Sequence, residues 1–264
     1  MEKKMKNTIA FVTGGASGIG QAVVSRIINH GGRVMIVDID HNGKQFAESL
    51  GHRAEFVLAD VTSEVEITRA LSEAEKKFGG INVVINAAAI ATVEDPYDFE
   101  NFKPHSLESY KRIMDVNVLG TFNVMRLAAG VLAKNVPDEN NQRGVIVNIA
   151  SILSFDAPGG MIAYGISKAA VAGMTLPMAR AFASKGIRVA AVAPGFIDTP
   201  MASSLKALCD GIFAPLDVVM LSPKRMGQPD EIAHMIQTII ENPMINAQVI
   251  RVDGGYTFVP NLNV

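Results

Sequence analysis

Short apolar runs rich in β-branched residues alternate along the whole sequence with longer segments of helical periodicity. Most of these runs are continuously apolar, a pattern typical of parallel strands buried on both faces of a sheet. Regular alternation of strand and helix predicts an α/β fold with a doubly wound parallel sheet and helices on both faces. The seven expected strands are Ile9–Thr13, Arg33–Asp38, Ala54–Asp60, Ile81–Asn86, Val145–Ile149, Arg188–Ala193 and Gln248–Val252.

The expected helices lie between these strands, at residues 18–31, 63–78, 107–133, 161–184 and 229–241. Glycines follow several of them, as expected where helices end. No Ser- or Pro-rich linker, low-complexity tract or internal repeat divides the chain. We therefore expect a single domain that spans residues 1–264.

Composition argues against several classes of function. The net charge of -2 favours neither nucleic acid nor an acidic membrane surface as a partner. The one cysteine, Cys209, excludes an internal disulfide framework; we interpret it as a free thiol, with a catalytic thiol as the alternative. The five histidines lack metal-binding spacing. Without a signal peptide or an apolar stretch of about 18 residues, we expect a cytoplasmic protein, or a mitochondrial matrix protein in a eukaryote.

A glycine-rich turn, Thr13–Gly20, directly follows the first expected strand and begins a helix. Glycines at positions 14, 18 and 20 allow a tight turn, close approach to a pyrophosphate and close packing of helix on sheet. The amide groups and the positive end of the helix dipole then attract phosphates. This arrangement predicts a Rossmann-type dinucleotide site.

Acidic residues end the next two expected strands. Asp38 can accept hydrogen bonds from the ribose hydroxyls of NAD and would repel the 2′-phosphate of NADP; an acid that merely caps the next turn is the alternative. Neither position 16 nor position 39 carries a basic residue, so NAD is the expected cofactor. Asp60 and Val61 lie at the end of the third expected strand, where an adenine is expected to lie.

Tyr164 and Lys168 are four residues apart in an expected helix, so their side chains share one face. This spacing alone is common in solvated helices. Ser151 adds a hydroxyl at the end of an apolar strand, at the edge of the sheet where open α/β folds bind ligands. Together with the glycine turn, the three residues predict an active site.

Over nearly its whole length, the chain resembles the short-chain dehydrogenase/reductase family. The matching positions are Thr13–Gly20, Asn86–Ala89, Asn117, Ser151, Tyr164, Lys168, Pro194-Gly195 and Thr199. The resemblance implies that Tyr164 transfers a proton, that Lys168 lowers its pKa and holds the nicotinamide ribose, that Ser151 holds the substrate oxygen, and that Asn117 supports a water relay. Ala89 departs from the family, which usually has glycine there.

Phrases outside these motifs, such as Asp115–Val124 and Met174–Pro177, resemble the subgroup that acts on 3-hydroxyacyl-CoA and hydroxysteroid substrates. This resemblance implies a homotetramer and an apolar substrate on Ser151 and Tyr164. The segment Thr92–Leu107 resembles an insertion of that subgroup. The cofactor contacts expected from the glycine turn and the resemblance are Gly14, Ser17, Gly18, Ile19, Gly20, Asp38, Asp60, Val61, Asn86, Ala87, Tyr164, Lys168, Ile197 and Thr199.

Several alternatives stay open at this point. The apolar residues of segment 201–225 predict a lid over the substrate, with a subunit contact as the alternative. A dehydrogenase of small secondary alcohols without CoA recognition would carry the same motifs. A non-catalytic NAD-binding scaffold would share the fold, because a fold does not fix a function.

Overall fold

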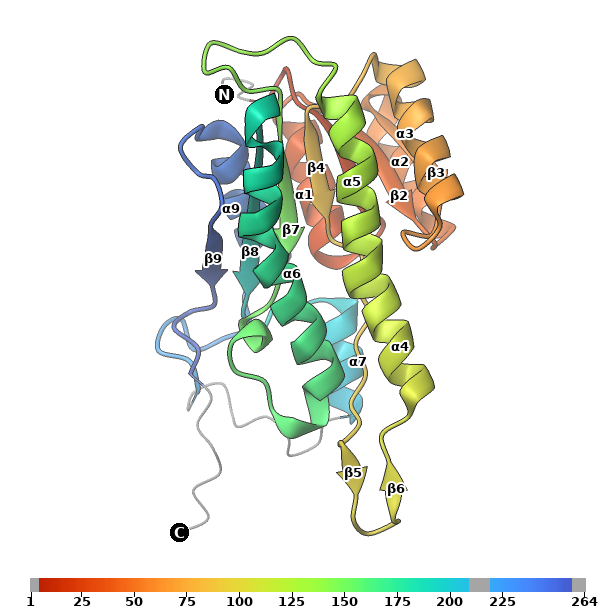
Figure 1. The fold of residues 1–264 in the computed structure, drawn as a ribbon, viewed down its shortest axis with the longest axis vertical. Coiled ribbons are helices and arrows are strands. Elements are labelled where there is room, and N and C mark those ends of the chain that lie inside the picture. Colours follow the sequence, from red (N-terminus) through yellow and green to blue (C-terminus); the bar gives the residue numbers. More distant parts are fainter. Residues whose placement is uncertain (1–4, 209–218, 258–264) are drawn as a thin grey trace.

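A computed structural model describes residues 5–208 and 219–257 of the chain (Figure 1). Its centre is a seven-stranded parallel sheet in the order β3-β2-β1-β4-β7-β8-β9, with helices on both faces. The predicted doubly wound fold is confirmed. The sheet strands are β1 (Ile9–Thr13), β2 (Arg33–Asp38), β3 (Ala54–Leu58), β4 (Val83–Asn86), β7 (Gly144–Ile149), β8 (Ile187–Pro194) and β9 (Val249–Val252).

The path of the chain reverses at β1. From β1 the chain passes outward to β2 and β3, and β4 then pairs with the opposite side of β1. Where the strand order reverses, the loops after β1 and β4 lead to opposite sides and leave a crevice at the carboxyl ends of the strands. This crevice is the position at which open α/β sheets bind ligands.

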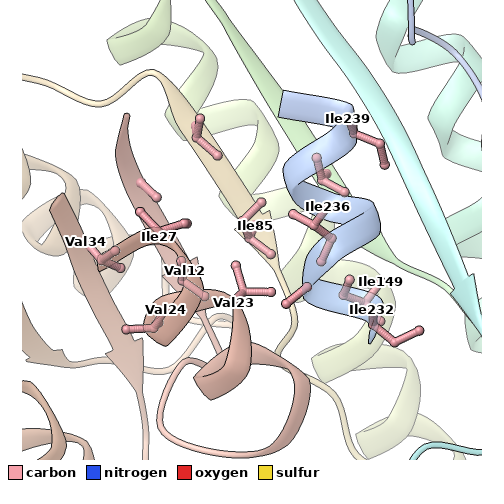
Figure 2. Packing of buried hydrophobic residues seen from close by; sticks show 14 of the residues in the cluster. Val12, Val23, Val24, Ile27, Val34, Ile85, Ile149, Ile232, Ile236 and Ile239 are labelled. Carbon is pink, nitrogen blue, oxygen red and sulfur yellow. The ribbon is translucent and has the colours of Figure 1, made fainter. Parts of the chain in front are cut away.

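Two apolar layers explain why the strands are continuously apolar. Val12 of β1 packs with helices α1 (Gly18–Asn29), α2 (Asn42–Leu50) and α9 (Pro229–Glu241) on one face, as Figure 2 shows in part. Its neighbour Phe11 packs with α3 (Glu64–Phe78), α5 (Thr121–Leu132) and α6 (Ile162–Phe182) on the other. Successive strand residues point to opposite faces, so a sheet covered on both sides needs apolar residues at both.

The expected helix 107–133 is not one continuous α-helix. It consists of α4 (Leu107–Met114), a π-helical turn η2 (Asp115–Gly120) and α5, which follow one another as one bent rod in Figure 1. A π turn carries one residue more than an α turn, and such turns are frequent at functional sites. Asn117 lies inside it.

Three further elements lie outside the predicted set. Helix α2 covers an edge of the sheet, and α7 (Pro200–Leu208) follows β8. The segment Thr92–Leu107 contains the antiparallel hairpin β5 (Tyr97–Asp98) and β6 (Lys103–Pro104), which projects away from the sheet in Figure 1. No helix among the described residues is long and apolar enough to cross a membrane.

Candidate active site

The glycines of the first turn are required by packing. Gly14 has φ +64°, and a Cβ at this position would lie 2.6 Å from the backbone nitrogen of Ala88. A Cβ on Gly20 would overlap the carbonyl oxygen of Gly14. Helix α1 therefore packs directly on the turn after β1. Its N-cap, Ser17, makes no side-chain capping bond, and the first turn holds no acidic residue. The helix start thus keeps backbone donors for an anionic ligand.

A cleft of about 780 Å³ opens in front of this helix start, at the carboxyl ends of β1 and β4. Twelve of the expected cofactor residues line it: Gly14, Ser17, Gly18, Ile19, Gly20, Asp38, Asp60, Val61, Ala87, Tyr164, Lys168 and Thr199. Asn86 and Ile197, also expected as cofactor contacts, are buried and are not among the lining residues. The free helix terminus, the glycine turn and the cleft together suit a dinucleotide.

Neighbouring hydrogen-bond donors hold the acidic side chains of Asp38 and Asp60 in the cleft. The Asp38 carboxylate accepts hydrogen bonds from the amides of Ala16 (3.0 Å) and Asp40 (3.1 Å), which fixes it at the end of β2. Asp60 accepts bonds of 2.8 Å from the amide and the hydroxyl of Thr62. The prediction that Asp38 merely caps a turn accounts for the Asp40 bond but not for its position on the cleft wall.

Ser151, Tyr164 and Lys168 come together as predicted, from two elements. Ser151 follows β7 and caps the short 3-10 turn η3 (Ile152–Ser154), where its hydroxyl accepts a bond of 3.1 Å from the Leu153 amide. Helix α6 carries the other two residues, and the Lys168 ammonium lies 5.7 Å from the centre of the Tyr164 ring. Lys168 donates a bond of 2.7 Å to the carbonyl of Ile149, the last residue of β7.

Burial controls the proton affinities of this pair. Burial raises the pKa of Tyr164 to about 12, against a smaller lowering by its hydrogen bond with Ser151. Burial also lowers the pKa of Lys168 to about 8. The resemblance led us to expect a tyrosine pKa that Lys168 lowers; in this structure the pKa is raised instead, because desolvation exceeds every stabilising contact. Any lowering must therefore accompany ligand binding.

Asn117 is fully buried in the π turn and holds the loop after β4. Its amide oxygen accepts from the Ile90 amide (2.8 Å), and its amide nitrogen donates to the Ile90 carbonyl (2.9 Å). The Asn117 carbonyl accepts a bond of 2.7 Å from the Thr121 hydroxyl. The side chain therefore fixes a segment that lines the cleft, and it does not line the cleft itself.

Asn86 at the end of β4 and Ala89 after it are both motif positions with a structural role in this region. Asn86 donates a bond of 2.8 Å to the buried Asn148 and so links β4 to β7 beneath the cleft. Ala89 lines the cleft and does not have positive φ, so the glycine usual in the family is not needed for its backbone conformation.

The cleft also has a wall that the sequence reasoning missed. Helix α4 and the π turn contribute Glu108, Lys111, Arg112, Asp115 and Val116. The charged residues among them recur at helical spacing. This pattern is the same as that of an ordinary solvent-exposed helix face, so the sequence did not distinguish the two. Only the bend in the backbone shows that this face borders the cleft.

An apolar cluster packs against Tyr164. Phe196 and Tyr256 meet edge to face within it, with ring centres 5.3 Å apart. The cluster consists of Ile152, Leu153, Met161, Val219, Met220 and Tyr256, with Ala91, Val93, Tyr164, Phe196 and Leu205 packed against it. The side chain of Tyr164 thus lies beside apolar side chains.

Comparisons with known proteins show which family the chain belongs to. A family model described as "Enoyl-(Acyl carrier protein) reductase" matches residues 14–257. The chain is 43% identical to "3-hydroxyacyl-CoA dehydrogenase type-2" of Drosophila melanogaster, over 97% of this chain and 100% of the relative. It is 42% identical to the protein of that name from Homo sapiens, over 98% of each chain.

A solved structure of the Mycobacterium avium protein with the same name has a TM-score of 0.88 and 34% identity, and the match covers 97% of this chain and 98% of that one. The predicted resemblance to the subgroup is confirmed. The chain is an oxidoreductase that interconverts secondary alcohols and ketones and uses a nicotinamide cofactor. It belongs to the short-chain dehydrogenase/reductase family.

Proposed function

We propose that this oxidoreductase uses NAD to oxidise an apolar secondary alcohol, a 3-hydroxyacyl-CoA or a hydroxysteroid-like molecule. The observation that carries the proposal is the hydrogen-bonded pair of Ser151 and Tyr164 hydroxyls, because Tyr164 both lines the cleft and packs against the apolar cluster. The names of the Drosophila and human relatives favour the thioester. Smaller secondary alcohols remain the competing substrates.

Ser151, Tyr164 and Lys168 have separate roles in the proposed oxidation. Ser151 donates a hydrogen bond to the carbinol oxygen and Tyr164 accepts one from the carbinol hydroxyl, which requires both groups to be fixed before the substrate arrives. Tyr164, as phenolate, takes the hydroxyl proton while the carbinol carbon loses its hydrogen with the bonding electrons. NAD, when bound, supplies the acceptor for that hydride. Lys168 carries a positive charge below a pKa of about 8 and favours the phenolate.

The apolar cluster supports a water-poor site for the rest of the substrate. Each buried methylene contributes about 0.8 kcal/mol, so a long acyl chain or a ring system gains from such a surface. We propose that segment 201–225 closes over it as a lid. Leu205 and Met220 of that segment pack in the cluster. Residues 209–218, with the expected contacts Phe213 and Leu216 and the thiol of Cys209, lie outside the described residues.

We infer NAD rather than NADP from the end of β2. The Asp38 carboxylate is fixed on the cleft wall by two amide donors, and Ile39 beside it is 66% exposed and uncharged. A 2′-phosphate near this carboxylate would meet repulsion, and position 39 supplies no cation to compensate it. The ribose hydroxyls of NAD could instead donate to it.

We also infer a homotetramer, from two separate surfaces. Helices α5 and α6 leave apolar side chains in solvent, among them Phe122 (43% exposed), Ile166 (41%) and Leu176 (42%). Among the described residues, strand β9 forms an edge of the sheet and pairs with β8 alone. Two self-complementary surfaces on one subunit generate a closed tetramer.

The function is tested with a substrate panel. NADH formation should rise in kcat/KM along a series of 3-hydroxyacyl-CoAs of increasing chain length until the apolar site is full, because each added methylene is desolvated. Steroids and simple alcohols belong in the same panel. Higher rates with polyols or sugars than with every apolar substrate would contradict the proposal, and no turnover with any member would favour the scaffold alternative.

Tyr164→Phe should lower kcat at least about a hundredfold while NADH still binds, and Tyr110→Phe serves as its control.

The cofactor preference is tested at Asp38. Asp38→Ala combined with Ile39→Arg should lower the ratio of NADH to NADPH affinity by about tenfold or more, because repulsion is replaced by a cation. Fluorescence titration with each cofactor measures both dissociation constants. Asp40→Ala, a second exposed carboxylate nearby, should leave the ratio unchanged. Tighter binding of NADPH than of NADH by the unmodified protein would refute the assignment.

The burial of Lys168 predicts a gain in stability when its charge is removed. Its pKa is about 8 in the folded protein against 10.5 for an ordinary lysine, so the unfolded chain binds more protons between these pH values. Wild-type stability therefore rises with pH across that window. Lys168→Met should raise the free energy of unfolding by roughly 1–3 kcal/mol at pH 7, with a gain that fades toward pH 10.5.

Urea unfolding of the two proteins at pH 7 and pH 10 measures this difference. Lys44→Met, at an exposed position of α2, should change stability by less than about 0.5 kcal/mol. Activity should be lost in Lys168→Met alone. A less stable Lys168→Met protein at pH 7 would show that the contacts of the lysine exceed the cost of its burial.

The tetramer is tested on the α5–α6 surface. Leu176→Glu places a charge in the inferred contact and should convert the tetramer to a smaller species, whereas Val65→Glu, on the exposed face of α3, should not. Sedimentation velocity at micromolar concentration distinguishes the species. A monomeric wild-type protein would rule out the assembly.

A further inference from the structure

Ser167 is buried on α6 between the two proposed catalytic residues of that helix and does not line the cleft. Its hydroxyl donates a hydrogen bond of 2.7 Å to the backbone carbonyl of Tyr164. The same hydroxyl accepts a bond of 2.9 Å from the side-chain nitrogen of Asn117 in the π turn. One side chain therefore links the catalytic helix to the residue that holds the loop after β4.

The number of protons fixes the direction of these bonds. A serine hydroxyl has one proton, and here it is given to the Tyr164 carbonyl, so toward Asn117 the oxygen can only accept. The amino group of Asn117 must then face Ser167. The first proton of this amino group goes to the Ile90 carbonyl and the second to Ser167, while the amide oxygen accepts from the Ile90 amide. If the Asn117 amide were rotated by 180°, its amino group would face the Ile90 amide and its oxygen would face the Ile90 carbonyl. Neither hydrogen bond could then form.

We propose that Ser167 is a positioning residue for the oxidation of the alcohol, an inference that rests on the proposed function. By accepting the second amide proton of Asn117, it ties the amide that Ile90 orients to α6 and so holds Ile90 in register with that helix. Ala87, Ala88, Ala89 and Ile90 line the cleft, and α6 carries Tyr164 and Lys168. The hydroxyl thus keeps the cofactor-facing loop and the proton-transferring side chain in one arrangement.

Removal of the hydroxyl should affect turnover more than binding. Ser167→Ala leaves the second amide proton of the fully buried Asn117 without an acceptor, so the amide and the Ile90 backbone can shift. We expect kcat at saturating NAD to fall on the order of tenfold, with the KM for the alcohol within about threefold of wild type. Thr175→Val is the matched control, because Thr175 is also buried on α6 and its hydroxyl donates to the Val171 carbonyl without contacting Asn117. A kcat for Ser167→Ala equal to that of Thr175→Val overturns the proposal.

A second measurement does not depend on activity. In protein labelled with ¹⁵N-asparagine, the side-chain amide pair that disappears in Asn117→Ala identifies this residue, and both of its protons should exchange slowly in wild type. In Ser167→Ala one proton should exchange rapidly, while Thr175→Val retains the wild-type pattern. Unchanged exchange in Ser167→Ala overturns the proposal even if the enzyme is active. If no substrate is turned over, the proposed function fails, and the amide exchange still decides whether Ser167 holds Asn117.

Ser167→Cys provides the same test should the alanine variant not fold. The thiol occupies a similar volume but is a weak acceptor, so the faster exchange and the lower kcat are expected there as well. A cysteine variant with wild-type kcat and slow exchange counts against the proposal.

Discussion

Helix α1 approaches the first strand so closely that a side chain at position 20 would overlap the carbonyl oxygen of Gly14. The same turn presses against the loop after β4, because a Cβ at position 14 would meet the backbone of Ala88. Two strands and one helix start are therefore held together by backbone contacts that no other residue type permits. The position of the cleft, its free amide donors and its loop of alanines all depend on this close packing.

The chemistry of the site depends on the opposite property, the burial of groups that prefer water. Because the sheet is covered on both faces, the residues at its carboxyl edge emerge into a largely apolar surrounding. Tyr164 resists ionisation there, and Lys168 is held by a single carbonyl of β7. Such a pair destabilises the folded chain by itself. The large apolar layers offset that cost and keep both groups in place before a ligand arrives.

The sequence was sufficient to predict the strands, because residues buried on both faces leave an unambiguous apolar pattern. It also predicted that Tyr164 and Lys168 share a helix face, since that follows from helical spacing alone. The π turn escaped prediction because an extra residue changes the hydrogen-bond pattern of Asp115–Gly120 without interrupting its helical periodicity. The hairpin strands Tyr97–Asp98 and Lys103–Pro104 are too short to leave a periodic signal. The direction of the Tyr164 pKa shift depends on desolvation, which only coordinates show.

The π turn gives the rod formed by α4 and α5 two independent helical phases. Each residue advances an α-helix by about 100°, so the one additional residue rotates everything before it by about that angle relative to everything after it. Asn117 keeps the phase that faces Ser167, while Glu108, Lys111 and Arg112 keep the phase that faces the cleft. The additional residue of the π turn therefore changes the direction in which the two parts of one continuous segment face, one toward Ser167 and the other toward the cleft.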